Sequence, residues 1–159
     1  MNADVVLAKT WTTRTVAASV MLLVLTLAVL AAYLGESSGA PLYMAFHGLC
    51  HQQHERCFHF FGMPMAICIR CTAIYSGILF GATLMPFLSE KNRMFLVGML
   101  ITASLLVGLD VAAEAIGLYH DVAAMRLFTG GVLGISISPF FITALRDLLT
   151  ATPTHRHSP

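Results

Sequence analysis

Residues 15–34 read TVAASVMLLVLTLAVLAAYL, a stretch that contains no charged side chain. An α-helix crosses the hydrocarbon core of a bilayer with about 20 apolar residues, so this stretch predicts a membrane-spanning helix. Its apolar run is longer than the roughly 7–15 residues of a signal-peptide core. We therefore interpret the stretch as an anchor and not as a cleaved leader.

Three further apolar stretches predict three more spans. Residues 65–88 contain one charge, Arg70, residues 94–118 contain Asp110 and Glu114, and residues 127–145 contain none. Lipid offers the backbone no hydrogen-bond partner, so each span is expected to be helical. We predict an all-α polytopic membrane protein, with one bundle of four transmembrane helices within residues 1–150 and a disordered tail at 151–159. Small residues spaced four apart predict close helix contacts at two places: Gly77 and Gly81, and Gly130, Gly134 and Ser138.

The composition excludes other classes of protein. Hydrophobic residues make up 57% of the chain and charged residues 11%, whereas soluble domains average about 45–50% and about 25%. The mean hydropathy is +0.78. The net charge of +1 provides no basic surface for a nucleic acid. The expected partner is the lipid bilayer, and a second copy of the chain or the subunits of a larger membrane complex stay open as further partners.

The distribution of basic residues predicts the orientation. With four spans both termini lie on the same side, and most lysines and arginines of the chain lie on that side too. Basic loops face the cytoplasm. We therefore expect a protein of the inner (cell) membrane with both termini in the cytoplasm and residues 35–64 on the outer face.

Cysteine and histidine gather in that outer segment. Residues 47–57 read HGLCHQQHERC, and residues 68–71 read CIRC. We expect residues 41–61 to form a short helix in the outer interface. Helical spacing would then place one stripe on a single face: His47, Cys50, His51, His54, Phe58 and Phe61. In the second span Cys68, Cys71 and Tyr75 share a face as well, so the two stripes are expected to face each other.

The first interpretation of these residues is a metal site, with zinc as the favoured ion. Zinc takes four nitrogen or sulfur ligands, and Cys-x-x-Cys is a common half-site. Cys68 and Cys71 would supply two thiolates, and Cys50 with one of the nearby histidines would complete the set. Met63 and Met65 raise copper as an alternative, because thioethers suit soft metals.

Two other interpretations compete with the metal site. A quinone-linked thiol–disulfide oxidoreductase would use the same cysteines together with Cys57, since a helix N-terminus favours a reactive thiolate. A helix over 41–61 would, however, separate Cys50 from Cys57 by about 10.5 Å along its axis, whereas a disulfide needs Cα atoms within about 7 Å. The third interpretation is that the cysteines serve only as small apolar side chains that pack between helices.

Charged residues form a second group near the outer ends of the spans. Charges at this depth are costly and normally face the interior of a bundle or a wet cavity. One interpretation is an ion network that joins the helices, formed by Arg70, Asp110, Glu114 and Arg126. The other is a polar cavity below the cysteines, in which Glu55 and Glu114 would be candidate acid/base groups.

The spacing of these residues resembles a known family pattern. The run Leu49-Cys50-His51-Gln52, followed by Arg56, Phe58 and Pro64 and then by Cys68-x-Arg70-Cys71-Thr72, Tyr75 and Gly77, is similar to the motif of domain-of-unknown-function family 2085. The resemblance covers roughly residues 45–135 and implies a small multi-span membrane protein. This chain has Cys57 where the family pattern has serine, which weakens a shared four-cysteine relay and favours a metal.

The resemblance and the residues together give one predicted site. The predicted ligands are Cys50, His51, Cys68 and Cys71, with His47 as the substitute for His51. Four further residues are expected to support the ligands: Gln52, Arg56, Arg70 and Tyr75. The predicted site could be structural or catalytic, so whether the protein is an enzyme stays open.

Overall fold

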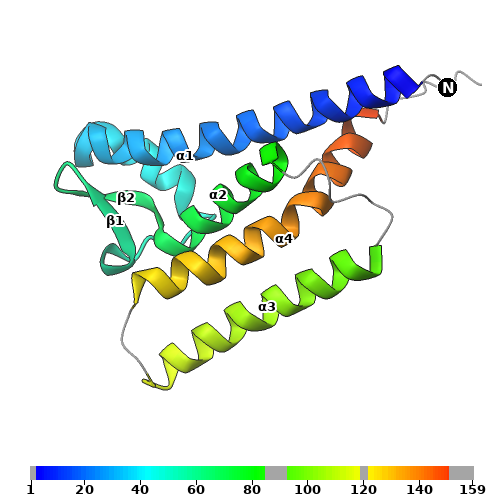
Figure 1. The fold of residues 1–159 in the computed structure, drawn as a ribbon. Helices are drawn as coiled ribbons and strands as arrows, with labels where there is room; N and C mark the ends of the chain where they lie inside the picture. The colour runs from blue at the N-terminus through cyan, green and yellow to red at the C-terminus, as the bar shows by residue number, and fades with distance from the viewer. Residues whose placement is uncertain (1–2, 85–92, 119–121, 151–159) are drawn as a thin grey trace, which may run out of the picture.

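The computed structural model describes residues 3–84, 93–118 and 122–150 and consists mainly of helices (Figure 1). The elements follow one another as α1 (Ala3–His47), the 3-10 turn η1 (His54–Arg56), β1 (Cys57–Phe60), β2 (Met63–Cys68), α2 (Ile69–Leu84), α3 (Arg93–Ala115) and α4 (Ala123–Thr150). The start of α1 and the end of α4 lie at one end of the molecule, and the hairpin of β1 and β2 lies at the other (Figure 1). The predicted tail at 151–159 falls outside the described residues.

Three of the described helices are long and apolar enough to cross a membrane. They cover Trp11–Gly35, Arg93–Ala115 and Ala123–Thr150, so three of the predicted spans are confirmed. The fourth predicted span, 65–88, is wrong for the described residues. Residues 63–68 form a strand instead, and the described part of α2 has 16 residues. At 1.5 Å per residue it is about 24 Å long, shorter than a hydrocarbon core of about 30 Å.

The predicted interfacial helix over 41–61 is also wrong. Gly35 adopts φ 73° and ψ −176° and breaks α1, a backbone conformation open in practice to glycine alone. The following helical segment folds back along α1 and ends at His47 (Figure 1). Gly39 allows this close return, since a Cβ atom there would lie 2.6 Å from the Ala31 carbonyl oxygen. The chain beyond His47 forms a loop, so the stripe of histidines and cysteines does not exist.

A β-hairpin replaces the expected helix–turn–helix junction. Its tip has positive φ at Phe61 (56°) and Gly62 (79°), the pair of angles that a two-residue type I′ turn requires. Phe60 pairs with Met63, and Cys57 pairs with Cys68. The span predicted to begin at residue 65 therefore does not start there, and Pro64 directly before it lies in β2 opposite His59.

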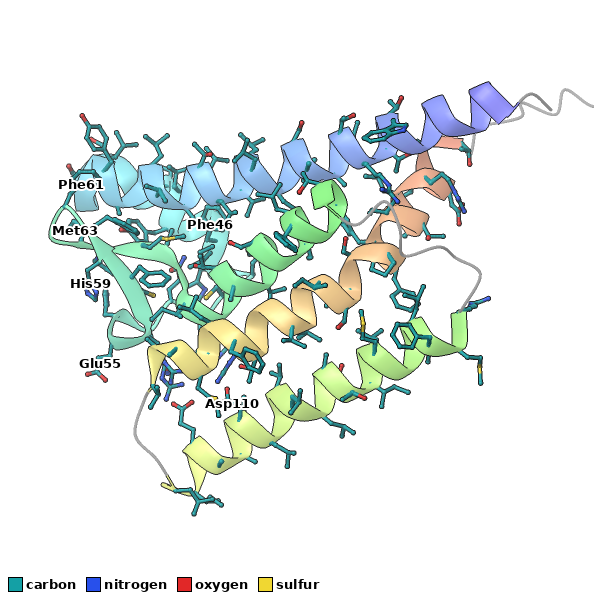
Figure 2. All side chains as sticks on the ribbon, viewed as in Figure 1. Phe46, Glu55, His59, Phe61, Met63 and Asp110 are labelled. Atoms are coloured by element: carbon teal, nitrogen blue, oxygen red, sulfur yellow. The ribbon has the colours of Figure 1, made fainter. Side chains whose placement is uncertain are left out.

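The hairpin packs on the inner side of the folded-back α1. Seven buried residues form one cluster there: Ala28, Ala31, Phe46, Cys50, Met65, Ala66 and Ile67. Figure 2 shows Phe46 directed into the space between the folded-back segment and the other elements. The loop after α1 and the strand before α2 are thereby held against the same apolar surface.

Helices α2 and α4 approach each other through the predicted small residues. A Cβ atom at Gly134 would lie 2.2 Å from the carbonyl oxygen of Ile74, and one at Gly77 would lie 2.6 Å from that of Gly131. A Cβ atom at Gly81 would lie 2.5 Å from the side chain of Ser138. The backbones are thus in direct contact, as small-residue packing in membranes predicts.

The α2–α4 contact can be tested by adding one methyl group. Gly134→Ala is expected to lower the thermal unfolding temperature in detergent by several degrees, because overpacking costs about 1–3 kcal/mol. Gly131→Ala is the matched control on the same helix, because a Cβ atom there meets nothing within 4 Å. Equal unfolding temperatures for the two variants would contradict the packing described here.

Candidate metal centre and arginine pocket

Three cysteines from two separate segments meet at the start of α2. Cys50 lies in the loop after α1, Cys68 ends β2, and Cys71 lies in the first turn of α2. Their sulfur atoms all lie within 4.8 Å of one another. Cys50 is buried, with 6% of its surface exposed, whereas Cys68 and Cys71 are half-buried.

This arrangement fits a tetrahedral metal ion. A zinc–sulfur distance of about 2.3 Å places the sulfurs of a tetrahedral site about 3.8 Å apart, so a small contraction of the cluster would complete it. The backbone N–H of Cys68 donates a hydrogen bond of 3.2 Å to the Cys50 sulfur. The positive end of the α2 dipole also lies beside the cluster and favours thiolates. Hydrogen bonds from the Cys68 thiol, and then from the Cys71 thiol, lower the pKa of Cys50.

Protein groups hold the loop that carries Cys50. Gln52 adopts a positive φ of 47°, and its side-chain amide donates two hydrogen bonds of 2.8 Å, to the carbonyl oxygens of Tyr43 and Ala66. The Tyr43 hydroxyl donates a hydrogen bond to the carbonyl of Pro64. The loop is therefore joined both to the folded-back helix and to β2.

Cys57 lies apart from the cluster. It is buried, and its thiol donates a hydrogen bond of 3.2 Å to the Gln53 carbonyl oxygen. Burial, and then the nearby charges of Cys50 and Cys68, raise the pKa of Cys57 to about 11. At neutral pH the group is a thiol, which is a poor nucleophile.

Charged side chains from four segments form one ion-pair network beside the cysteines. Arg70 on α2 lies 2.5 Å from the Asp110 carboxylate and 3.7 Å from that of Glu114. Arg126 on α4 pairs with Glu114 as well. The side chains of Asp110 and Arg126 are 2% and 3% exposed. In Figure 2 Asp110 points from α3 towards α4, so the network joins α3 to α2 and α4.

Arg56 belongs to the same network, which the sequence alone did not indicate. Its guanidinium lies 2.9 Å from Glu114. With residues 41–61 taken as a helix, Arg56 fell off the stripe of candidate ligands. The observed 3-10 turn over His54–Arg56 instead brings it to the end of α3 that carries Glu114. The resemblance to the family motif was the signal that singled it out.

A pocket of about 160 Å³ lies between the cysteine cluster and the network. Its wall is formed by His51, Gln52, Gln53, Arg56, Cys68, Arg70 and Arg126. His51 is exposed, and its ring nitrogens are not part of the cluster of three sulfurs. His51 nevertheless lines this pocket together with Cys68.

The other predicted site residues lie in different surroundings. His47 is exposed at the end of α1, and Tyr75 packs beside Cys68 and Cys71 against the apolar cluster. Glu55 is exposed and points away from the helices (Figure 2). Met63 and Met65 line a second pocket of about 330 Å³, so these thioethers do not share the pocket of the cysteines.

Comparison with known proteins places the chain among membrane proteins. The model of a family described as predicted membrane protein, DUF2085, matches residues 50–140. The chain belongs to this family. An uncharacterized protein of Methanocaldococcus jannaschii is 32% identical over 130 residues, which cover 74% of this chain and 81% of that relative. No solved structure matches the chain significantly.

The family match begins at Cys50 and ends at Phe140. It therefore includes the three clustered cysteines, the hairpin, α2, α3 and the whole ion-pair network. The resemblance predicted from the motif is confirmed. The chain is a membrane protein of this family, and its cysteine cluster can hold a metal ion.

The buried ion pair predicts that substitution of two different aspartates lowers the stability of the protein by very different amounts. Asp110→Asn removes the charge opposite Arg70, and breaking a buried pair costs on the order of 3 kcal/mol. Asp147→Asn is the control, since Asp147 is 71% exposed and lies 3.8 Å from Arg146, where a pair contributes at most about 1 kcal/mol. Thermal unfolding in detergent is expected to show a clear loss for the first variant and almost none for the second. Equal losses would contradict a structural role for the network.

Proposed function

We propose that the protein is a membrane metalloprotein in which Cys50, Cys68 and Cys71 bind one zinc ion. The observation that carries this proposal is the meeting of three sulfurs from two chain segments within 4.8 Å. Sulfur-rich tetrahedral sites are typical of zinc or of iron–sulfur clusters. Iron–sulfur clusters are typically held by four cysteine thiolates, whereas three cysteines come together here and Cys57 lies outside the group.

We propose His51 as the fourth ligand. It follows Cys50 directly in the chain and shares a pocket wall with Cys68, while His47 lies at the end of α1 on the other side of the loop. A Cys3His set is a common structural zinc site, and loss of the histidine would leave a position for water, as in catalytic sites. The arginine network beside the cluster would offset the negative charge of the thiolates.

We also propose that the centre faces the outer side of the membrane. The cysteine cluster lies at the end of the molecule opposite the start of α1 and the end of α4 (Figure 1). The basic residues of the chain favour the side of the termini as the cytoplasmic one.

The quinone-linked alternative has less support. The pocket beside the cysteines, about 160 Å³, is smaller than the roughly 300–1,000 Å³ of pockets for drug-sized ligands and is lined by charged groups. Cys57, which a four-cysteine relay requires, has a raised pKa and is buried. Two observations favour the relay: Cys57 lies opposite Cys68 in the hairpin, and the helix that would have held Cys50 and Cys57 apart is not formed.

The proposed zinc site predicts that replacing different cysteines by serine has different effects on the amount of bound zinc. The full chain, purified in detergent without added metal, is expected to carry one zinc ion as measured by mass spectrometry of the metal content. Cys68→Ser is expected to lose it, because a serine hydroxyl is a poor zinc ligand. Cys57→Ser is the matched control in the paired strand and is expected to retain it. A wild-type chain with no metal and four titratable thiols would contradict the proposal, and loss of quinone reduction in Cys57→Ser would support the relay.

The fourth ligand is tested with histidine variants. His51→Ala is expected to weaken zinc binding without abolishing it, because three thiolates and a water molecule can still hold the ion. Competition with a colourimetric chelator measures the affinity. His59→Ala, an exposed histidine on β1, is the control and is expected to bind like wild type. A larger effect for His47→Ala than for His51→Ala would instead identify His47 as the ligand.

A further inference from the structure

The pocket between the cysteine cluster and the network is strongly cationic. Arg56 comes from the turn before the hairpin, Arg70 from the first turn of α2, and Arg126 from the first turn of α4. Three guanidinium groups from three chain segments therefore share one wall with His51 and Cys68. Arginine is the residue of choice for binding carboxylates and phosphates, because its planar donors match their oxygens.

The carboxylates of Asp110 and Glu114 do not use all the N–H donors of the arginines, so donors stay available for a ligand. Asp110 and Glu114 do not line the pocket, and the Nη2 atoms of Arg56 and Arg70 lie against them. Each guanidinium carries five N–H donors. The Nε–H of Arg70 is buried and meets no acceptor among the described residues.

The size of the pocket limits what can enter it. A volume of about 160 Å³ corresponds to roughly five water molecules at about 30 Å³ each. A compact anionic group fits this space, and the rest of a larger molecule would stay outside the pocket. A carboxylate has two oxygens and is satisfied by one arginine fork, while three arginines that approach from three segments suit a group with three free oxygens.

We propose that this pocket binds a phosphate group, supplied either by a lipid headgroup or by a soluble phosphate compound. The arginines and His51 would hold the oxygens, and Cys68 in the wall would place the group beside the metal centre. The proposal deepens the proposed function, because it names the ligand class of the same site. Only the closeness of the phosphate to zinc depends on the proposed function. The phosphate pocket itself is inferred from the arginines.

The experiment uses the full chain in detergent and two probes. Equilibrium dialysis with radiolabelled inorganic phosphate measures the soluble source. Native mass spectrometry with phosphatidic acid, and with diacylglycerol as the phosphate-free control, measures the lipid source. We expect binding of inorganic phosphate or of phosphatidic acid and none of diacylglycerol. Whichever probe binds identifies the source, and competition between the two would place both in one pocket.

Variants then place the binding in the pocket. Arg56 is 44% exposed, so Arg56→Gln is expected to fold and to weaken binding about tenfold or more, since it removes one charge-assisted contact. Arg56→Lys retains the charge without the fork and is expected to bind with intermediate affinity. Arg146→Gln, at the far end of α4, is the matched control and is expected to bind like wild type.

The same samples are analysed for zinc, so that the two proposals fail separately. Phosphate binding without zinc would overturn the metal centre and support the pocket. Zinc without binding of either phosphate probe at millimolar concentration would overturn the pocket and leave the metal centre standing. Equal weakening in Arg56→Gln and Arg146→Gln would also overturn it, because it would show attraction to the overall charge of the protein.

Discussion

The direct backbone contact between α2 and α4 fixes the position of every group at the site. A Cβ atom at Gly130 would lie 2.7 Å from the carbonyl oxygen of Arg70, so the first turns of the two helices touch each other. That contact sets Arg70 and Cys71 on α2, and Cys68 directly before this helix, against Arg126 on α4. Helix α3 then joins through ion pairs with Asp110 and Glu114, and the loop with Cys50 closes the site from the side of α1.

The membrane character and three of the spans could be predicted from the sequence because both depend on one simple quantity, the length of an uncharged apolar run. The hairpin could not be predicted in this way. Residues 63–68 are apolar throughout, and a short apolar run of this kind has no period that separates a strand from a buried helix. The turn at Phe61–Gly62 was the only local signal for it, since glycine favours positive φ, but phenylalanine at such an angle is uncommon.

The candidate site was partly predictable for a related reason. Cys68 and Cys71 are only three residues apart in the chain, so they stay close together although Cys68 ends β2 and does not belong to a helix. The approach of Cys50 depends instead on the reversal of the chain at Gly35 and on the loop held by Gln52. The place of Arg56 beside Glu114 depends on the end of the helix at His47. The positions of Cys50 and Arg56 thus depend on how distant parts of the chain fold, which the spacing of residues along the chain does not reveal.

The bonds of Gln52 and Tyr43 have a consequence for how an ion would enter and leave. In small zinc domains the ligands come together only when the metal binds, so metal binding and folding are one event. Here the Gln52 side chain fastens the loop with Cys50 to Tyr43 and Ala66, and the Tyr43 hydroxyl fastens α1 to Pro64, without any ion. The site is preorganised, and an ion can exchange while the chain stays folded. Loss of the proposed zinc ion would therefore leave the fold of this loop in place.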